Sequence, residues 1–146
     1  MKSKTNGFSF FEVIVVLVIM SILLAIAIPG YRSIVLKNGR VEARSALTAL
    51  ALQQERLRST CPYYARSIGT ADSCGDSSDK TFVAFKQTTE SNRYILSVKT
   101  PDDGDKSYDY SIFAIATGPQ AGDSQCRTMS LTLDKGTQTR GPSPCW

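Results

Sequence analysis

Two groups of side chains in this sequence could take part in chemistry: one acidic residue inside an apolar run, and four cysteines. Glu12 lies near the start of the run at residues 8–28, in which Ser9 and Ser21 are the only other polar residues. A carboxylate surrounded by hydrocarbon is costly, and it is kept where it has a function and a partner. The sequence therefore indicates a functional role for Glu12.

The four cysteines, Cys61, Cys74, Cys126 and Cys145, all follow the apolar run. An even number of cysteines in a small exported domain is typical of disulfides. Of the three possible pairings we favour Cys61–Cys74 and Cys126–Cys145, because each closes a polar, turn-rich segment. Each such loop contributes about 3 kcal/mol in the chain-entropy model. A zinc site is disfavoured, because no two cysteines are close in sequence and the chain has no histidine.

No pattern in the sequence indicates catalysis. The chain lacks histidine, the commonest general base and metal ligand. It also lacks a glycine-rich phosphate loop and any metal-ligand spacing. Asp102, Asp103 and Asp105 could contribute oxygens to a calcium site, but the segment Pro-Asp-Asp-Gly-Asp is typical of a hairpin turn, which we favour. We therefore expect a protein that is not an enzyme and holds no metal or cofactor.

The apolar run is long enough to cross a membrane. A helix rises about 1.5 Å per residue, so residues 8–28 span a hydrocarbon layer of about 30 Å. Residues 1–7 precede this run and carry only Lys2 and Lys4 as charged side chains. A basic head before an apolar run is also typical of a secretory signal peptide, which would be cleaved after the run. The two interpretations differ in where the chain is cut.

The hexapeptide GFSFFE at residues 7–12, followed by the apolar run, resembles the class III leader of type IV prepilins. The resemblance implies that a prepilin peptidase cleaves between Gly7 and Phe8 and methylates the new amino group of Phe8. The apolar run then stays in the mature protein, and Glu12 lies one helical turn from a charged amino terminus with which it can pair, in its own subunit or a neighbour. The sequence departs from the commonest family pattern at Ser9, where Thr is usual, and at the two aromatic residues that follow it.

Beyond the apolar run, the sequence predicts the second half of the same helix, followed by an antiparallel sheet. We expect a single helix over residues 8–58, loosened at Pro29 and stopped by Pro62. Its second half is amphipathic, with an apolar stripe formed by Leu36, Ala43, Leu47, Leu50 and Leu57.

Residues 59–80 are rich in Ser, Gly and Asp and are expected to form a loop. Four segments then show strand patterns: 81–87, 93–99, 108–116 and 126–133. A turn at residues 134–136 leads into a tail. The sequence thus predicts an α+β fold with a long helix packed on a four-stranded antiparallel sheet. It also predicts three parts: a leader (1–7), an apolar transmembrane or filament-core helix (8–28) and a head (29–146).

This order of elements resembles type IVa pilins over essentially the whole chain. A cysteine at the start of the last predicted strand and a second one beside Trp146 resemble the disulfide-bounded C-terminal region of that family. The segment 120–123 and the Cys145-Trp146 pair are similar to minor pilins of the PilE and ComP kind. The resemblance implies a pilus subunit held in the bacterial inner membrane, with its head in the periplasm, until assembly into an extracellular filament. Its implied partners are other pilins, the prepilin peptidase and the inner-membrane assembly platform.

Binding of double-stranded DNA is the further function that the resemblance implies, since competence pilins of the ComP kind bind incoming DNA through loops and the disulfide-bounded segment. The net charge of +4 falls to +2 once Lys2 and Lys4 leave with the leader, which by itself does not identify a nucleic-acid binder. In this chain the corresponding regions hold seven cations: Arg66, Lys80, Lys99, Lys106, Arg127, Lys135 and Arg140.

Two other functions stay open from the sequence. The first is a purely structural or adhesive pilin, whose cations form an ordinary solvated surface. The second is a type II secretion pseudopilin, which shares the leader and, in some members, binds calcium. The four cysteines argue against the pseudopilin.

Overall fold

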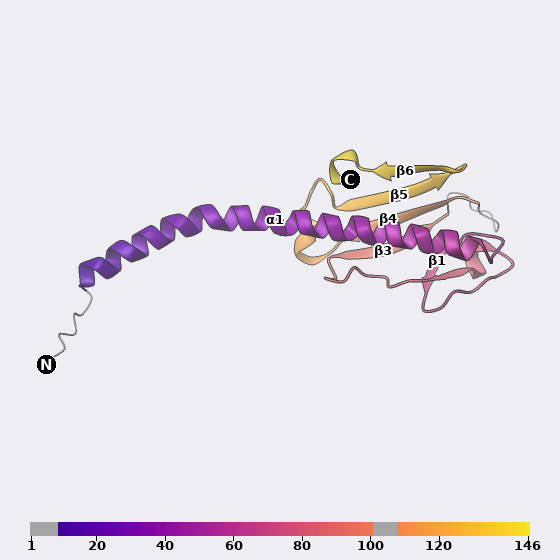
Figure 1. Cartoon of the computed structure of the whole chain (residues 1–146), viewed down its shortest axis with the longest axis horizontal. Helices are drawn as coiled ribbons and strands as arrows, with labels where there is room; N and C mark the ends of the chain where they lie inside the picture. The colour runs from indigo at the N-terminus through magenta and orange to yellow at the C-terminus, as the bar shows by residue number, and fades with distance from the viewer. Residues whose placement is uncertain (1–8, 101–107) are drawn as a thin grey trace, which may run out of the picture. The chain divides into compact units, whose positions relative to one another are not determined.

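The computed structural model describes residues 9–100 and 108–146, and its first element is one long helix. Helix α1 spans Phe10–Arg58 and continues through Pro29 (Figure 1). The missing amide hydrogen of a proline removes one backbone hydrogen bond without ending the helix here. The predicted helix is confirmed from residue 10 to residue 58.

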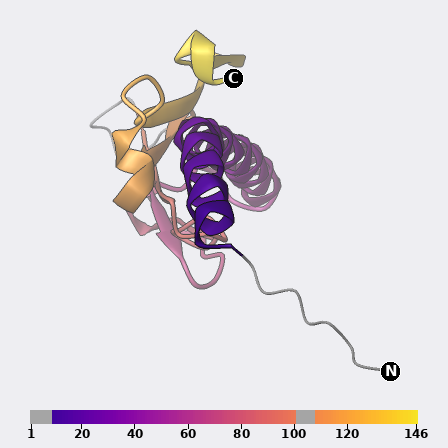
Figure 2. The ribbon, with the colours of Figure 1, turned by 90° about the vertical axis from the view of Figure 1, so that its left-hand side faces the viewer.

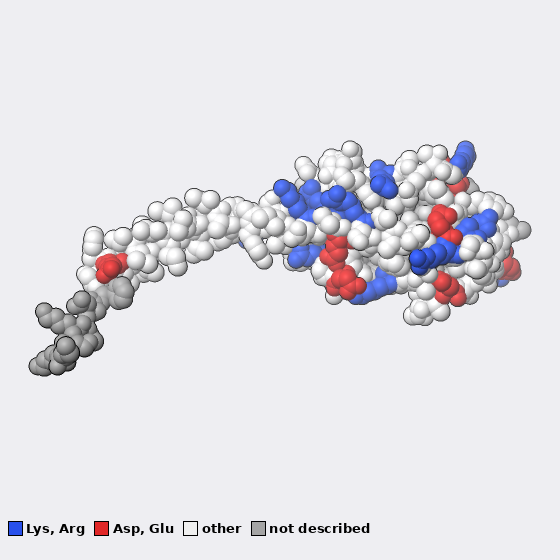
Figure 3. Space-filling view, viewed as in Figure 1, with Lys and Arg blue, Asp and Glu red and all other residues white. Residues whose placement is uncertain are grey.

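The chain divides into two compact units, residues 1–35 and residues 36–146. In the first unit every described residue from 9 to 34 is exposed, although almost all of them are apolar. This part of α1 is long and apolar enough to cross a membrane. The face seen in Figure 3 is almost free of charged atoms along this part of the helix.

In the second unit, which we call the head, α1 buries one stripe of residues against the rest of the chain. The stripe consists of Gly39, Ala43, Leu47, Leu50, Ala51, Gln54 and Leu57. It confirms the predicted stripe except for Leu36, which is half-buried, and adds Gly39, Ala51 and Gln54. The Gln54 amide donates to the Ala65 carbonyl (2.9 Å) and accepts from the Ala65 amide (3.1 Å), so it fixes the chain just after the helix.

Four antiparallel strands form the main sheet in the order β3-β4-β5-β6. They are β3 (Tyr94–Lys99), β4 (Tyr110–Ala116), β5 (Thr128–Asp134) and β6 (Thr137–Gly141). The head part of α1 lies against one face of this sheet (Figure 1 and Figure 2). Alternate residues of β3, β4 and β5 point into the core, and Tyr94, Ile112 and Leu131 are fully buried there. The α+β fold of a pilin is thereby confirmed.

One predicted strand was assigned to the wrong sheet. Within residues 81–87, β2 (Phe82–Ala84) pairs in parallel with β1 (Ser67–Gly69). Only the end of the segment touches the main sheet, where the Gln87 carbonyl accepts from the Leu96 amide of β3 (2.7 Å). The fourth strand of the main sheet is β6, which pairs with β5 and which the sequence analysis described as a tail. Strand β6 is polar and almost wholly exposed, so it shows no alternation of apolar and polar residues.

A tight turn creates β6. Lys135 and Gly136 have φ angles of +48° and +78° and form a two-residue connection between Asp134 and Thr137, which are paired. Positive φ at both central residues is typical of the turns that match the twist of a hairpin. The chain after Gly136 must therefore return along β5.

The two disulfides join Cys61 to Cys74 and Cys126 to Cys145, the pairing that the sequence favoured. The first ties the loop after α1 to the segment before β2. The second ties the C-terminal segment to the start of β5. Each restricts a polar segment that has few apolar residues to bury.

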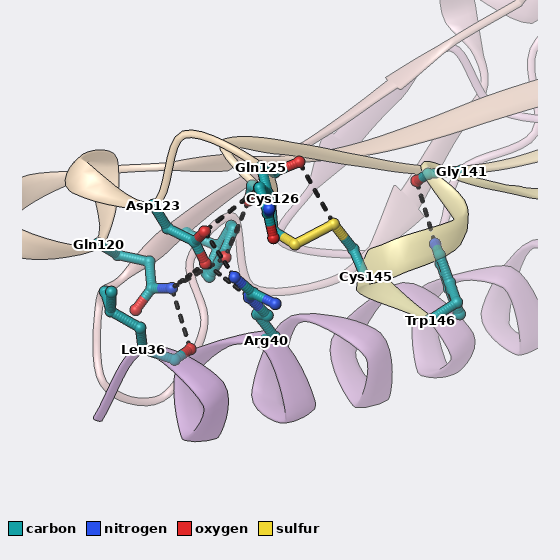
Figure 4. Close-up of a disulfide and its surroundings, with 10 residues drawn as sticks. Leu36, Arg40, Gln120, Asp123, Gln125, Cys126, Gly141, Cys145 and Trp146 are labelled. Atoms are coloured by element: carbon teal, nitrogen blue, oxygen red, sulfur yellow. Dashed lines mark hydrogen bonds and ion pairs between the residues drawn. A yellow bond between two sulfur atoms is a disulfide. The ribbon is translucent and has the colours of Figure 1, made fainter. Parts of the chain in front are cut away.

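A polar contact joins α1 to the loop between β4 and β5. Arg40 donates two hydrogen bonds to Asp123, at 2.6 Å and 2.7 Å, and the Asp123 side chain is 3% exposed. Beside it the Gln120 amide donates to the Leu36 carbonyl (3.1 Å) and to the Tyr94 hydroxyl (3.2 Å), as Figure 4 shows in part. A buried ion pair of this geometry fixes the position of the loop.

Gly39 permits this contact. A Cβ atom at position 39 would overlap the side-chain amide of Gln120, so the helix and the loop approach each other only where the helix lacks a side chain. The contact lies beside Cys126, whose amide donates to the Asp123 carboxylate at 3.4 Å. The helix, the loop and the second disulfide are thus held together at one place.

We expect Asp123→Asn to lower the free energy of unfolding of the head by about 3 kcal/mol at pH 7, because it leaves the Arg40 guanidinium without its charged partner. The hydrogen bonds from Arg40 lower the pKa of the Asp123 carboxyl. The carboxyl therefore stabilises the fold above its unfolded pKa of about 4, and this stabilisation is lost as the pH falls through the lower folded pKa. Denaturation of residues 36–146 at pH 7, 5 and 3 measures both effects.

The matched control is Asp76→Asn, which removes an exposed carboxylate whose pKa is also lowered, by Lys80. It should change the stability little, because exposed ion pairs are screened by water and salt. Equal effects of the two substitutions, or the same pH profile for wild type and Asp123→Asn, would contradict a stabilising role for the buried pair.

Candidate nucleic-acid interface

Four of the predicted cations lie at the end of the sheet that carries the β3–β4 connection and the β5–β6 hairpin. We call Arg66, Lys80, Lys99 and Lys135 the turn-end cations. The Arg66 guanidinium donates to the Thr100 hydroxyl (2.6 Å), just after β3, and the Arg66 amide donates to the carbonyl of Ser78 (3.2 Å), two residues before Lys80. The Lys135 amide donates to Asp109, just before β4, at 2.8 Å.

Acidic and aromatic side chains accompany these cations. Lys80 pairs with Asp76 at 3.0 Å, where both side chains are exposed. The Lys99 ammonium lies 5.9 Å from the centroid of the Phe113 ring on the outer face of the sheet. The turn-end cations are therefore a set of separate positive groups with acids between them, and the long-range field of such a surface is weak.

The sequence analysis missed an arginine–tyrosine cluster at this same end of the head. The guanidinium carbon of Arg58 lies 5.6 Å from the Tyr108 ring centroid and 5.9 Å from that of Tyr64. Tyr63 meets Tyr108 edge to face, with the centroids 6.0 Å apart, and Tyr108 is 60% exposed. The signal was available in the sequence, because Arg58 ends the helix and two tyrosines follow within six residues.

A carboxylate on α1, Glu55, holds two tyrosines of this region in place. Glu55 accepts hydrogen bonds from the hydroxyls of Tyr64 (2.9 Å) and Tyr110 (3.2 Å). Burial raises the pKa of Tyr64 to about 12 and that of Tyr110 further, so both phenols stay protonated and can donate to Glu55 at neutral pH. Of the two rings beside Arg58, Tyr64 is therefore fixed by Glu55 before any ligand arrives.

Two predicted cations lie elsewhere. Arg127 precedes β5 at the opposite end of the sheet, where its carbonyl accepts from the Ala116 amide at 2.8 Å. Arg140 lies on β6 opposite the buried residue Leu131, and its guanidinium carbon is 5.2 Å from the Trp146 ring centroid. The predicted set therefore does not form one continuous patch among the described residues. Lys106 lies outside the residues that the structure describes.

A second basic stripe, also missed, runs along α1. Lys37, Arg40 and Arg44 are spaced by three and four residues, which places them on one side of the helix. Figure 3 shows Lys and Arg atoms gathered over this part of α1. The sequence analysis did not consider these three side chains as a binding surface, and the structure commits one of them, Arg40, to the ion pair with Asp123.

No group of three or more His, Cys, Asp or Glu residues that could hold a metal occurs within residues 9–100 and 108–146. The proposed turn residues Asp102, Asp103 and Asp105 lie outside those ranges. The described part of the head therefore offers cations and aromatic rings, which suit contacts to phosphate, sugar and base.

Two families of known proteins match the chain. Residues 29–130 match the family described as "Type IV minor pilin ComP, DNA uptake sequence receptor". Residues 2–28 match the prokaryotic N-terminal methylation motif. No curated protein sequence matches the chain. The first match covers most of the head, including all the cations discussed above except Lys135 and Arg140.

Proposed function

Because the chain belongs to the type IV minor pilin ComP family, we propose that it is a pilus subunit that binds DNA during its uptake in natural transformation. The family match carries this proposal, and the cations and tyrosines at the turn end of the head supply groups for the contact. Members of this family serve as filament subunits rather than as enzymes. The partners are accordingly other pilins and DNA, and we propose no catalytic step.

The chain is anchored in the membrane by its apolar helix and is later assembled into an extracellular pilus, as the methylation motif and the exposed apolar half of α1 indicate. We propose that prepilin peptidase removes residues 1–7 by cleaving between Gly7 and Phe8 and that Phe8 is then methylated. Residues 8–28 form the membrane and filament-core segment, and residues 29–146 carry the head. The inner-membrane assembly platform is the partner that moves the subunit from lipid into the filament.

Glu12 would set the register of the subunit in the filament. Moving an apolar helix from lipid into a bundle of similar helices changes its hydrophobic burial little, so packing and polar pairs decide its position. Glu12 is the only ionised side chain in residues 8–28. Its carboxylate can pair with the positive amino group of Phe8 in its own chain or in a neighbour.

We expect Glu12→Ala to leave the subunit in the membrane and to reduce its amount in sheared pili at least tenfold, because the unpaired amino terminus is costly in an apolar bundle. Immunoblots of membrane and pilus fractions measure this partition. Ser21→Ala is the control, since Ser21 lies in the same helix and its hydroxyl donates to the Val18 carbonyl within that helix. Normal incorporation of Glu12→Ala would refute the pairing.

The DNA contact is expected to be largely electrostatic. Lys99 and Lys135 are exposed, and the ammonium of either can reach a phosphate without breaking the fold. Each phosphate contact adds about 0.9 to the slope of log affinity against log salt concentration. The exposed Tyr108 ring, with Arg58 over it, offers an apolar surface to sugar or base.

We expect the head to retard double-stranded DNA in a gel at low salt and much less at higher salt. Lys99→Gln and Lys135→Asn should each lower the salt slope by about 1. Lys86→Gln, which removes an exposed lysine already near Glu90 (3.7 Å), should leave the slope unchanged. Absence of retardation at low salt would exclude DNA binding by the head and favour a purely structural or adhesive pilin.

A further inference from the structure

An open groove with a volume of about 570 Å³ lies between α1 and the C-terminal segment of the head. We call it the Trp146 groove. Helix α1 contributes Arg44, Ser45, Thr48 and Leu52 to one side, and Arg140 and Trp146 form the other. The groove shares no residue with the turn-end cations or with the arginine–tyrosine cluster, and Arg140 is the one predicted cation that lines it.

The groove has an unbalanced positive charge. The Nε atom of Arg44 is buried and has no hydrogen-bond partner. Arg140 supplies a second guanidinium, and none of the residues that line the groove is an aspartate or a glutamate. Two guanidinium groups with no carboxylate among the residues that line the groove suit an anion there.

The wall opposite α1 is held rigidly. The Trp146 indole donates to the Gly141 carbonyl at 3.0 Å, which fixes the ring. The neighbouring Cys145 is joined to Cys126 at the start of β5. Arg140 packs over the indole, 5.2 Å from its centroid. A ligand would therefore lose little binding energy to ordering this side of the groove.

We propose that the Trp146 groove binds one phosphate of a DNA strand together with its deoxyribose, so that the head has a second DNA contact besides the turn-end cations. The phosphate accepts hydrogen bonds from Arg44 and Arg140, because guanidinium groups match the geometry of phosphate oxygens. The sugar packs on Trp146 and Leu52, which is 54% exposed. This proposal rests on the proposed function and adds a contact that is independent of base sequence.

The groove favours DNA over a carboxylate from a neighbouring pilin for one reason. A carboxylate needs a single guanidinium, whereas this groove places two arginines beside an apolar wall formed by an indole and a leucine. A nucleotide unit has both parts: a charged phosphate, and a sugar and base that can lie against an aromatic ring.

The fluorescence of Trp146 tests the proposal directly, because it is the only tryptophan in the chain. The mature full-length chain in nonionic detergent is titrated with a 16-nucleotide single strand and with a 16-base-pair duplex of arbitrary sequence. We expect saturable quenching by at least one of the two, with an affinity that falls steeply with salt. Arg44→Ala and Arg140→Ala should each weaken the quenching about tenfold, and Arg56→Ala should not.

Arg56 is the matched control because it is an exposed arginine on the same helix that does not line the groove. Arg140→Ala keeps the test decisive if Arg44→Ala does not fold, since Arg140 is exposed on an edge strand. DNA that is retarded in a gel without quenching Trp146 would overturn the groove while leaving the proposed function intact. Equal weakening of the quenching by Arg44→Ala and Arg56→Ala would also overturn the groove and leave the proposed function intact. A change in emission with protein concentration alone would assign the groove to contacts between subunits instead.

Discussion

A single helix in this protein must satisfy two environments, and the rest of the structure follows from that constraint. Apart from Glu12 and Ser21, residues 10–28 are apolar on every side, which suits lipid or a bundle of like helices. From Gly39 onward the same helix buries only one stripe against the head. Every buried residue described in the structure belongs to the head. The head therefore does not use the first half of the helix for its core, and that half can exchange lipid for other pilins.

The head then has to hold a polar C-terminal region against the second half of the helix. Few apolar residues are available there, and β6 is almost wholly exposed. The structure uses three other means: the Cys126–Cys145 disulfide, the Arg40–Asp123 ion pair and the close approach of Gln120 at Gly39. These contacts position Arg140 and Trp146 beside α1. The proposed DNA contact in the groove thus depends on the same features that close the fold.

The sequence predicted the helix, three of the four strands of the main sheet and the disulfide pairing, because each has a local signal. An apolar run, alternation in 93–99 and 108–116, and polar segments between cysteines can all be recognised without knowledge of the fold. Strand β6 was missed because its residues are polar, and it forms only because the turn at Lys135 and Gly136 returns the chain along β5. Residues 82–84 were placed in the wrong sheet because alternation does not reveal which strand is the partner.

The candidate DNA contacts could be predicted only as a list of cations. Which of them lie together depends on tertiary structure: Arg66, Lys80, Lys99 and Lys135 share one end of the sheet, whereas Arg127 lies at the other. Arg44 and Arg58 were missed because each gains its meaning from a partner far along the chain, Arg140 for the first and Tyr108 for the second.

The position of the mature N-terminus tests the account most directly. If the apolar half of α1 is the filament-core segment, mass spectrometry of the chain isolated from pili must find an N-terminal peptide that begins at Phe8 and carries one added methyl group. An N-terminal peptide that begins after Ala27, as cleavage of an ordinary signal peptide would leave, would contradict the account, because the helix that carries Glu12 would then be absent from the mature protein.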